Sequence, residues 1–317
     1  MTWLLSISAI VVGFVILVWA ADRFVLGAAA VARNFGVSTL VIGLTIVGFG
    51  TSAPELLVSA VAASFGSAEL CVGNAIGSNI TNITLVLGAA ALMAPMDVKG
   101  TVLRRELPVL VACMLLATGL MLDGNLGRID GVVLALGLVA MMGWVVWLGM
   151  RSEDPDTHEE IPESMKNSTA LFWVVVGLLL LLGASRLLVW GAVEVATMLH
   201  VPELVIGLAM IALGTSLPIR GQRDGRAAQR HDLAVGNVID GNMFNTLGVL
   251  ALPGLIHPHD VGVFVLRRDL PAMFGVTFLF FVMTRFFLRP AHVSRLEGGV
   301  LVTAFVGYMA WVYLTIA

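Results

Sequence analysis

VIGLTIVGFGTSAPELLVSAVAASFGSAELCVGNAIGSNITN, residues 41–82, is the segment from which the architecture of this chain can be worked out. It has the pattern of an apolar helix that is interrupted twice, at Gly50–Pro54 and again at Gly73–Asn79. Glu55 follows directly after the first interruption, in otherwise apolar sequence. A carboxylate is expensive to hold inside a membrane, so an acid in such a place normally marks the path of an ion or a substrate. The segment therefore predicts a polar site centred on Glu55.

The residues that precede Glu55 are those that allow a helix to unwind at mid-membrane. Pro54 removes a backbone donor, glycine tolerates unusual dihedral angles, and Thr51 and Ser52 supply hydroxyl oxygens. Thr51, Ser52 and Glu55 lie within about one helical turn, so an unwound helix directs all three toward one point. Freed carbonyls and hydroxyls are ligands that suit a hard cation.

The second interruption adds further oxygen ligands. Asn82 lies one helical turn after Ser78, so both side chains belong to one helix face. A polar cluster that only joins helices is the alternative, because Ser, Thr and Asn side chains form hydrogen bonds across membrane helices. That alternative does not explain a lone acid. We therefore expect a cation site with Glu55 as its charged ligand.

The same pattern occurs twice in the chain. VIGL begins at Val41 and again at Val205. Gly-Asn-x-Ile begins at Gly73 and again at Gly236. These matches indicate an internal duplication that covers most of the chain. The spacing between the two copies falls by one residue between Pro218 and Gly236.

The composition is that of a membrane protein. Of the 317 residues, 58% are hydrophobic and 12% are charged, and the apolar runs are long enough to cross a hydrocarbon core of about 30 Å. Candidate spans lie near residues 3–28, 38–65, 70–95, 102–122, 128–149, 170–195, 202–228, 233–256, 262–287 and 296–316. An odd number of spans per repeat places the second repeat upside down relative to the first. The predicted fold is an all-α polytopic membrane protein of about ten transmembrane helices, arranged as two inverted five-helix repeats with broken helices at the midplane.

A polar loop divides the chain into its two repeats. We expect residues 1–150 to form the first five-helix repeat and residues 169–317 the second. The connection at 151–168 is rich in Asp and Glu around two prolines. It lacks the ligand-Gly-ligand spacing of a calcium loop, so we expect a solvated cytoplasmic hinge.

The distribution of Lys and Arg predicts the orientation. With the N-terminus outside, most of the basic residues counted fall in internal loops, as the positive-inside bias requires; the count leaves out Arg220–Arg230. Both termini are then expected outside, in a protein of the bacterial inner membrane. The net charge is −3, and no long basic face is present, so no nucleic-acid partner is expected. The expected partners are inorganic cations and the lipid bilayer, with no obligate protein partner.

The paired segments resemble a known family. GTSAPELLVSAVAA with GNAIGSNITN in the first half, and GTSLP with GNVIDGNMFN in the second, are similar to the motifs of the cation/calcium antiporter superfamily. The likeness is greatest to the compact bacterial sodium/calcium exchangers built of two α-repeats, and it covers about the whole chain. It implies first-repeat cation ligands at Glu55, Thr51, Ser52, Gly48 (through its carbonyl), Ser78 and Asn82. It implies second-repeat ligands at Ala212, Thr215, Ser216 and Asn245.

Two positions of the second repeat depart from the family pattern. The second Glu is expected after Pro218, where Ile219 stands. The second Ser is expected at position 241, where Gly241 follows Asp240. The family site uses two facing carboxylates to balance a divalent cation or several sodium ions at low dielectric. This chain provides one, Glu55.

The resemblance implies a secondary antiporter that exchanges calcium for sodium by alternating access. It implies no enzymatic activity, and no cofactor apart from the transported Ca²⁺ and Na⁺. Because of Ile219, two alternatives stay open: an inactive family member, and an exchanger of other cations such as protons or potassium. A passive cation channel is disfavoured by the inverted duplication. An intramembrane hydrolase that uses Ser52 or Ser216 lacks a histidine base within any predicted span.

Residues 219–230, IRGQRDGRAAQR, differ in kind from their apolar repeat partner, ELLVSAVAASFG. Insertion scales charge roughly 2.5 to 3.5 kcal/mol for each Arg at the centre of a span. Back-translated with GC-rich codons and read one nucleotide later, the segment encodes SAASVTAALR, in which SVTAA aligns with Ser59–Ala63. We hypothesise a local frameshift that removed a Glu codon after Pro218. Such an event also accounts for the one-residue fall in the repeat spacing.

Overall fold

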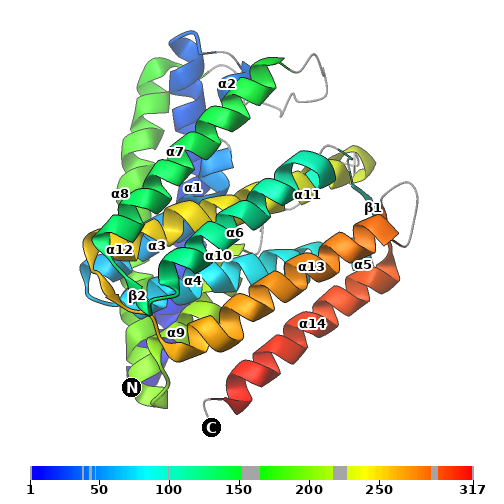
Figure 1. The fold of residues 1–317 in the computed structure, drawn as a ribbon. Helices are drawn as coiled ribbons and strands as arrows, with labels where there is room; N and C mark the ends of the chain where they lie inside the picture. The colour runs from blue at the N-terminus through cyan, green and yellow to red at the C-terminus, as the bar shows by residue number, and fades with distance from the viewer. Residues whose placement is uncertain are drawn as a thin grey trace.

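A computed structural model of the chain describes residues 2–37, 39–42, 45–46, 48–98, 100, 102–151, 165–216, 227–286 and 292–315. These residues form helices and four strands of two residues each (Figure 1). The first half contains α1 (Thr2–Asn34), α2 (Thr39–Ile42), α3 (Gly48–Ser64), α4 (Ala68–Thr81), η2 (Asn82–Val86), α5 (Leu87–Met93), β1 (Met96–Asp97), η3 (Val102–Glu106), α6 (Leu107–Met121), β2 (Asn125–Leu126) and α7 (Arg128–Arg151). The second half contains α8 (Asn167–Leu199), α9 (Glu203–Ile206), η5 (Gly207–Ile211), α10 (Ala212–Ser216), α11 (Ala227–Phe244), η6 (Asn245–Val249), α12 (Ala251–Ile256), β3 (His259–Asp260), η7 (Val265–Asp269), α13 (Leu270–Phe286), β4 (His292–Val293) and α14 (Arg295–Leu314).

Departures from α-helical geometry recur in both halves. The segments η2 and η3 are single π-helical turns, in which the backbone bond skips one residue more than in an α-helix. Their counterparts η6 and η7 begin at Asn245 and Val265, at the spacing that separates the two Gly-Asn-x-Ile motifs. The duplication inferred from sequence is therefore present in the backbone, down to the same local irregularities.

The longest helices show that the two halves are inverted. Helices α1 and α8 lie side by side in Figure 1 and run antiparallel. A Cβ atom added to Gly13 would meet Leu188, whereas one added to Gly27, later in α1, would meet Ala170 near the start of α8. The contacts obtained by exchanging the halves are Gly177 with Phe24, and Gly191 with Ser6. The same interface is thus used twice, once from each repeat.

Two short antiparallel sheets connect the halves. In one, β1 pairs with β4, with Met96 opposite Val293. In the other, β2 pairs with β3, with Leu126 opposite His259. Each sheet takes one strand from each half, and exchange of the halves converts one pairing into the other.

At the centre, helix α4 crosses η5 with almost no space between the backbones. A Cβ atom on Gly73 would clash with the carbonyl oxygen of Leu204, and one on Gly207 would stand 2.5 Å from the carbonyl oxygen of Leu70. Small residues at a crossing allow membrane helices to approach closely, which increases van der Waals contact where no hydrophobic driving force operates. The two glycines come from different halves of the chain, so this crossing joins the repeats.

The prediction that the helix is interrupted at Gly73–Asn79 is wrong. Helix α4 is continuous from Ala68 to Thr81, and the π-helical turn begins only at Asn82. The glycines of this segment serve the close crossing rather than a break. The Gly50–Pro54 segment is also helical, because α3 begins at Gly48 and contains Pro54. Pro54 has no N–H, so the carbonyl of Gly50 lacks its usual helical donor.

Five helical segments in the described part of the chain are long and apolar enough to cross a membrane: Trp3–Asn34, Ala68–Met93, Arg128–Leu148, Asn167–Leu199 and Arg295–Leu314. Two shorter apolar helices, Ser52–Ser64 and Glu203–Thr215, fall within the second and seventh predicted spans. The number of ten spans stays a prediction. So do the repeat boundaries at 150 and 169, since most of the connecting loop lies outside the described residues.

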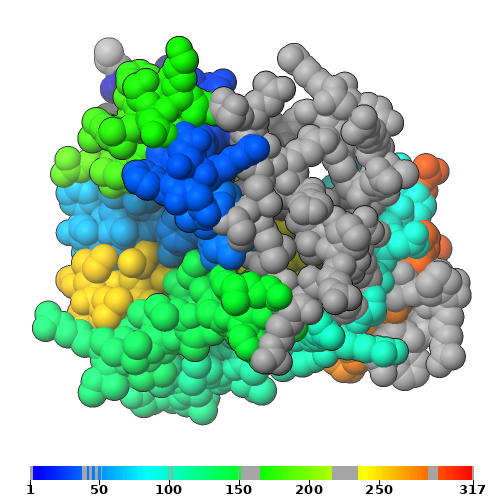
Figure 2. All heavy atoms as spheres, turned by 90° about the horizontal axis from the view of Figure 1, so that it is seen from above, coloured from blue at the N-terminus to red at the C-terminus, as the bar shows by residue number. Residues whose placement is uncertain are grey.

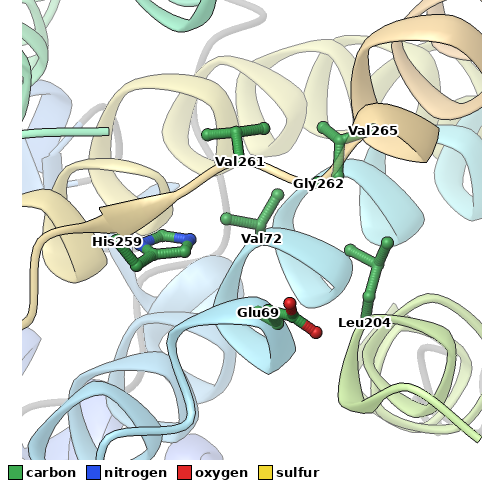
Figure 3. Close-up of a pocket in the computed structure, with 7 residues that line it drawn as sticks. All are labelled: Glu69, Val72, Leu204, His259, Val261, Gly262 and Val265. Carbon is green, nitrogen blue, oxygen red and sulfur yellow. The ribbon is translucent and has the colours of Figure 1, made fainter. Parts of the chain in front are cut away.

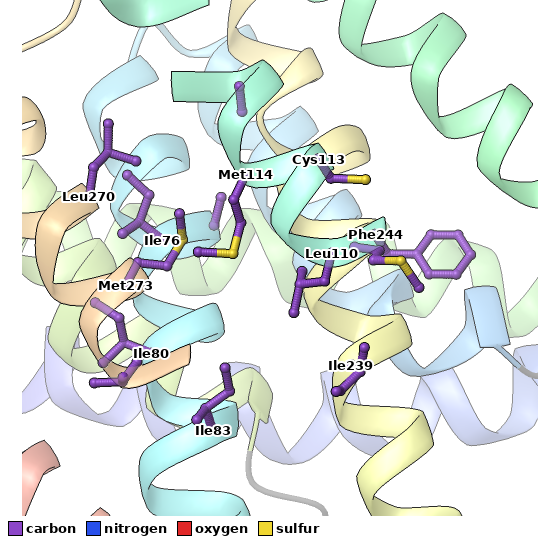
Figure 4. Packing of buried hydrophobic residues seen from close by; sticks show 14 of the residues in the cluster. Ile76, Ile80, Ile83, Leu110, Cys113, Met114, Ile239, Phe244, Leu270 and Met273 are labelled. Carbon is purple, nitrogen blue, oxygen red and sulfur yellow. The ribbon is translucent and has the colours of Figure 1, made fainter. Parts of the chain in front are cut away.

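The helices carry large apolar side chains on their outer faces. Val15 is 62% exposed, Leu136 63%, Leu179 63% and Val306 60%, as expected of surfaces that face lipid. Inside, Ile76, Ile80, Leu110, Phe244 and Met273 pack in a cluster that draws on both halves (Figure 4). Seen from above, first-half colours, from blue to teal, lie beside the yellow and orange of the second half (Figure 2). The halves therefore form one interlocked body.

We expect Gly73→Ala to destabilise the protein, because the added methyl group meets backbone atoms of Leu204 and Leu208. Overpacking of this kind costs about 1–3 kcal/mol, and the measurement is thermal unfolding of the detergent-solubilised protein. Gly119→Ala is the matched control, since nothing lies within 4 Å of a Cβ atom at that helical glycine. Equal unfolding temperatures for the two variants would contradict the close crossing.

Candidate cation site

Glu55 lies inside helix α3 and is almost fully buried. Its exposed fraction is 3%, and within the described part of the chain its Oε2 atom has no hydrogen-bond partner. A carboxylate removed from water without a partner is strongly unfavourable. The position therefore requires a compensating proton or cation.

A hydroxyl from the second repeat lies beside this acid. Thr215 of α10 is 9% exposed and its side chain is next to the Glu55 carboxylate. The Thr215 hydroxyl also donates to the carbonyl oxygen of Ile211 at 3.0 Å. The structure thus brings together Glu55 and Thr215, which belong to different repeats.

Helix α4 holds α3 in place through Asn74. The Nδ2 atom of Asn74 donates to the backbone oxygen of Glu55 at 3.3 Å and to the Oγ of Ser59 at 3.0 Å. Ser78, which is fully buried, donates to the Oδ1 of Asn74 at 3.4 Å. The predicted ligands Glu55 and Ser78 are therefore linked through one amide.

The position that departs from the family pattern lies beside two predicted ligands. A Cβ atom on Gly241 would stand 3.8 Å from the Oγ of Ser52 and 3.9 Å from the Nδ2 of Asn82. Asn82 in turn donates to the Oδ1 of Asn242 at 3.0 Å. Gly241 thus leaves space where a serine hydroxyl would lie against Ser52 and Asn82.

Asn245 and Ala212 complete the second-repeat side. Asn245 opens η6, which packs against α3 and α4. It is 1% exposed, and no described residue donates to its Oδ1 atom. Ala212 is buried at the crossing with α4, where a Cβ atom on Gly77 would stand 2.9 Å from its side chain. Helices α3, α4, α10 and α11 therefore converge on one region (Figure 1).

Three predicted ligands are placed by their backbone alone. Gly48 and Thr51 belong to α3 and Ser216 to α10, but the Thr51 and Ser216 side chains lie outside the described part of the structure. Ile219 also lies outside the described residues. Their roles, and the loss of the second carboxylate, stay predictions.

Hydrogen bonds of asparagine amides also join the repeats, and these residues were not among the predicted ligands. The Nδ2 atom of Asn79 donates to the Oγ1 of Thr246 at 2.8 Å, and the Nδ2 of Asn242 donates to the backbone oxygen of Asn79 at 3.2 Å. The sequence shows that Asn79 and Asn242 occupy the same place in the two motifs, so both residues could have been singled out. Their hydrogen-bond partners could not have been predicted, because these depend on how the repeats pack.

Two adjoining pockets open at the start of α4 and share Glu69, Leu204 and Gly262. Figure 3 shows the smaller of the two. The larger, of about 280 Å³, also reaches His200 and Arg268. Neither pocket is lined by Glu55. Burial lowers the pKa of His259, which lines the smaller one. The pockets are surface features at one end of the molecule rather than the site around Glu55.

The site is suited to hard cations. It combines one carboxylate with hydroxyl and amide oxygens, which are the ligands preferred by ions such as Na⁺ and Ca²⁺. No group of three or more His, Cys, Asp or Glu side chains among the described residues is arranged to hold a metal ion. Among the predicted ligands, Glu55 is the one that carries a charge. With two inverted repeats around it, this arrangement is that of a membrane transporter, and the candidate cation site lies at the interface of its repeats.

Comparison with known proteins identifies the family. Residues 5–147 and 169–314 match the family described as "Sodium/calcium exchanger protein". The chain is 40% identical to "Putative antiporter CaxA" of Alkalimonas amylolytica, over 94% of this chain and 96% of that one. It is 37% identical to "Inner membrane protein YrbG" of Escherichia coli (strain K12), over 98% and 97%. The chain belongs to the sodium/calcium exchanger family.

A solved structure supports the same assignment. The sodium-calcium exchanger NCX_Mj, soaked with 2.5 mM Na⁺ and 10 mM Sr²⁺, is similar at a TM-score of 0.64 and 30% sequence identity, over 98% of this chain and 99% of that one. The predicted fold class is confirmed by this likeness. The protein is an integral membrane antiporter of inorganic cations, and its family consists of transporters rather than enzymes.

We expect Glu55→Gln to weaken cation binding on the order of 100-fold, because it removes the one charge of the site while keeping its shape. Titration calorimetry with Ca²⁺ and with Na⁺ on the purified protein measures the loss. Glu159→Gln, in the polar loop between the repeats, is the control and should bind as the unmodified protein does. Unchanged affinity for both cations in Glu55→Gln would refute the assignment.

Proposed function

We propose that this protein exchanges sodium for calcium across the bacterial inner membrane by alternating access. The observation that carries the proposal is the Glu55 carboxylate, which is buried and has an oxygen without a partner among the described residues. Thr215 beside it and Asn245 nearby come from the second repeat. A cation bound there contacts both repeats, so a relative movement of the repeats changes the side from which it is reached.

The two cations compete for overlapping positions around Glu55. Both are hard ions that take oxygen ligands, and both need negative charge nearby at low dielectric. The exchanger NCX_Mj was soaked with sodium, strontium and calcium in its solved structures. Its likeness to this chain over nearly the full length supports the same ions here. No cofactor besides the transported cations is part of the proposal.

The single carboxylate favours a second candidate. One carboxylate balances one Na⁺, whereas a Ca²⁺ keeps one uncompensated charge, which is costly in a buried site. With Ile219 in place of an acid, the chain as written is therefore better suited to a monovalent cation, such as a proton or potassium, or to no transport. The frameshift hypothesis removes this difficulty, because the parent chain would carry Glu after Pro218.

The orientation is part of the proposal. We place the N-terminus and the C-terminus outside and the loop at residues 151–168 in the cytoplasm, according to the bias of Lys and Arg. Both chain ends lie toward the bottom of Figure 1.

We expect calcium uptake into sodium-loaded proteoliposomes to saturate and to require internal sodium. Ile219→Glu should raise the uptake rate at low calcium by about tenfold or more, since each gain of about 1.4 kcal/mol in binding energy is a factor of ten. Glu55→Gln, and vesicles loaded with choline in place of sodium, are the controls. Uptake that is linear in calcium and independent of internal sodium would indicate a channel instead.

The coding DNA tests the frameshift directly. We expect the alternative reading frame of residues 219–230 to encode an apolar run rich in Ser and Ala, preceded by a Glu codon. Sequencing of this segment from the source genome is the measurement. A stop codon or a polar run in that frame would mean that Ile219 is a real loss of the second carboxylate.

A further inference from the structure

Three asparagines form a directed chain of hydrogen bonds between the repeats. Asn242 Nδ2 donates to the backbone oxygen of Asn79 at 3.2 Å. Asn82 Nδ2 donates to the Oδ1 of Asn242 at 3.0 Å. The side chains of Asn242 and Asn79 are 1% and 2% exposed, and that of Asn82 is 9% exposed. This series of hydrogen bonds ends at Asn82, which is one of the predicted cation ligands.

The direction of this chain follows from its first member. A backbone carbonyl only accepts, so the atom of Asn242 that faces Asn79 is its nitrogen. The oxygen of Asn242 is then turned toward Asn82, and the atom of Asn82 that meets it is also a nitrogen. Asn242 therefore contacts the nitrogen of the Asn82 amide and makes no hydrogen bond with its Oδ1 atom.

The orientation of the Asn82 amide decides what a cation meets. An amide presents a negative oxygen at one end and a positive NH₂ group at the other, and only the oxygen is a ligand for a hard cation. Since Asn242 accepts a hydrogen bond from the NH₂ end of Asn82, a rotation that turned this end into the site would break a buried hydrogen bond.

The equivalent amide in the first repeat is engaged elsewhere. Asn79, which holds the place of Asn242 in the first-repeat motif, donates to the Oγ1 of Thr246 at 2.8 Å and lies 3.4 Å from the Sδ of Met273. Thr246 provides this acceptor, whereas the equivalent position in the first repeat is Ile83. Among the described residues Asn245 Oδ1 has no partner. Among the described residues, the hydrogen bond that orients Asn82 therefore has no counterpart at Asn245.

We propose that Asn242 is a positioning residue for cation binding, which holds the Asn82 amide with its oxygen toward the site. This inference rests on the proposed function, because it assigns Asn82 a role as a ligand. Residues that orient a metal ligand through a hydrogen bond typically change metal affinity by about 10–100-fold when they are replaced.

The test is a double-mutant cycle on the full-length protein, read out by titration calorimetry with Ca²⁺ and with Na⁺. Asn242→Ala is expected to weaken binding of the cation that the unmodified protein takes by about tenfold. In an Asn82→Asp background, the same change should weaken binding by less than about threefold. The reason is that a carboxylate at position 82 presents an oxygen whichever way it turns.

Thr246→Val is the matched control, because it removes two hydrogen bonds of the same buried network, from Asn79 and to the backbone oxygen of Asn242, and neither involves the Asn82 amide or the side chain of Asn242. Its affinity should stay within about twofold of the unmodified protein. Asn242→Leu, which fills the volume of Asn242, repeats the test if the alanine variant is poorly folded. A dissociation constant does not depend on the fraction of molecules that fold. A lower yield of folded protein would therefore not be mistaken for a loss of cation affinity.

Each outcome decides between the two proposals. Equal losses of affinity in Asn242→Ala and Thr246→Val, or an equal loss from Asn242→Ala in both backgrounds, would overturn the positioning role and leave the proposed function standing. An unmodified protein that binds neither Ca²⁺ nor Na⁺ would overturn the proposed function and this inference with it. The expected result is a loss specific to Asn242 that Asn82→Asp suppresses.

Discussion

A single carboxylate held out of water is the constraint on which the rest of this structure depends. Glu55 is 3% exposed, with an oxygen that no described residue contacts by a hydrogen bond. In such a place a charge is tolerated only with a proton or a cation close by. Thr215 lies beside the acid, and Asn245 belongs to η6, which packs against α3. A cation bound beside Glu55, as we propose, supplies that positive charge.

The inverted duplication explains how such a site is assembled from both halves of one chain. Membrane helices lack a hydrophobic driving force toward one another, so they associate through close packing and hydrogen bonds. The glycines at 73 and 207 bring two backbones into contact at the centre, and the antiparallel pairing of α1 with α8 repeats the same contacts from either side. Each half therefore provides a surface that fits closely against the other half, and each half contributes some of the predicted oxygen ligands.

The two halves are not equivalent at the site. Gly241 is the second-repeat equivalent of Ser78, and it leaves space beside Ser52. Thr246 is the equivalent of Ile83, and its hydroxyl accepts a hydrogen bond from Asn79. Inverted repeats can diverge in this way because each motif position occurs once in each half, and the two copies can be substituted independently. The predicted charged ligand, Glu55, and the amide that Asn242 contacts, Asn82, therefore both belong to the first repeat.

The sequence by itself determined the membrane class and the duplication, which follow from composition and from spacing. It also predicted a site at Glu55, from the free energy of a charge in apolar surroundings. Even the π-helical turns at Asn82 and Asn245 recur at the spacing that the motifs show. Only the tertiary structure decided that α4 is continuous, since Gly73 and Gly77 read equally well as a break or as a contact surface until their neighbours are known. The partner of Asn82 was likewise beyond reach of the sequence. An amide is oriented by the group it faces, and that group, Asn242, lies far along the chain in the opposite repeat.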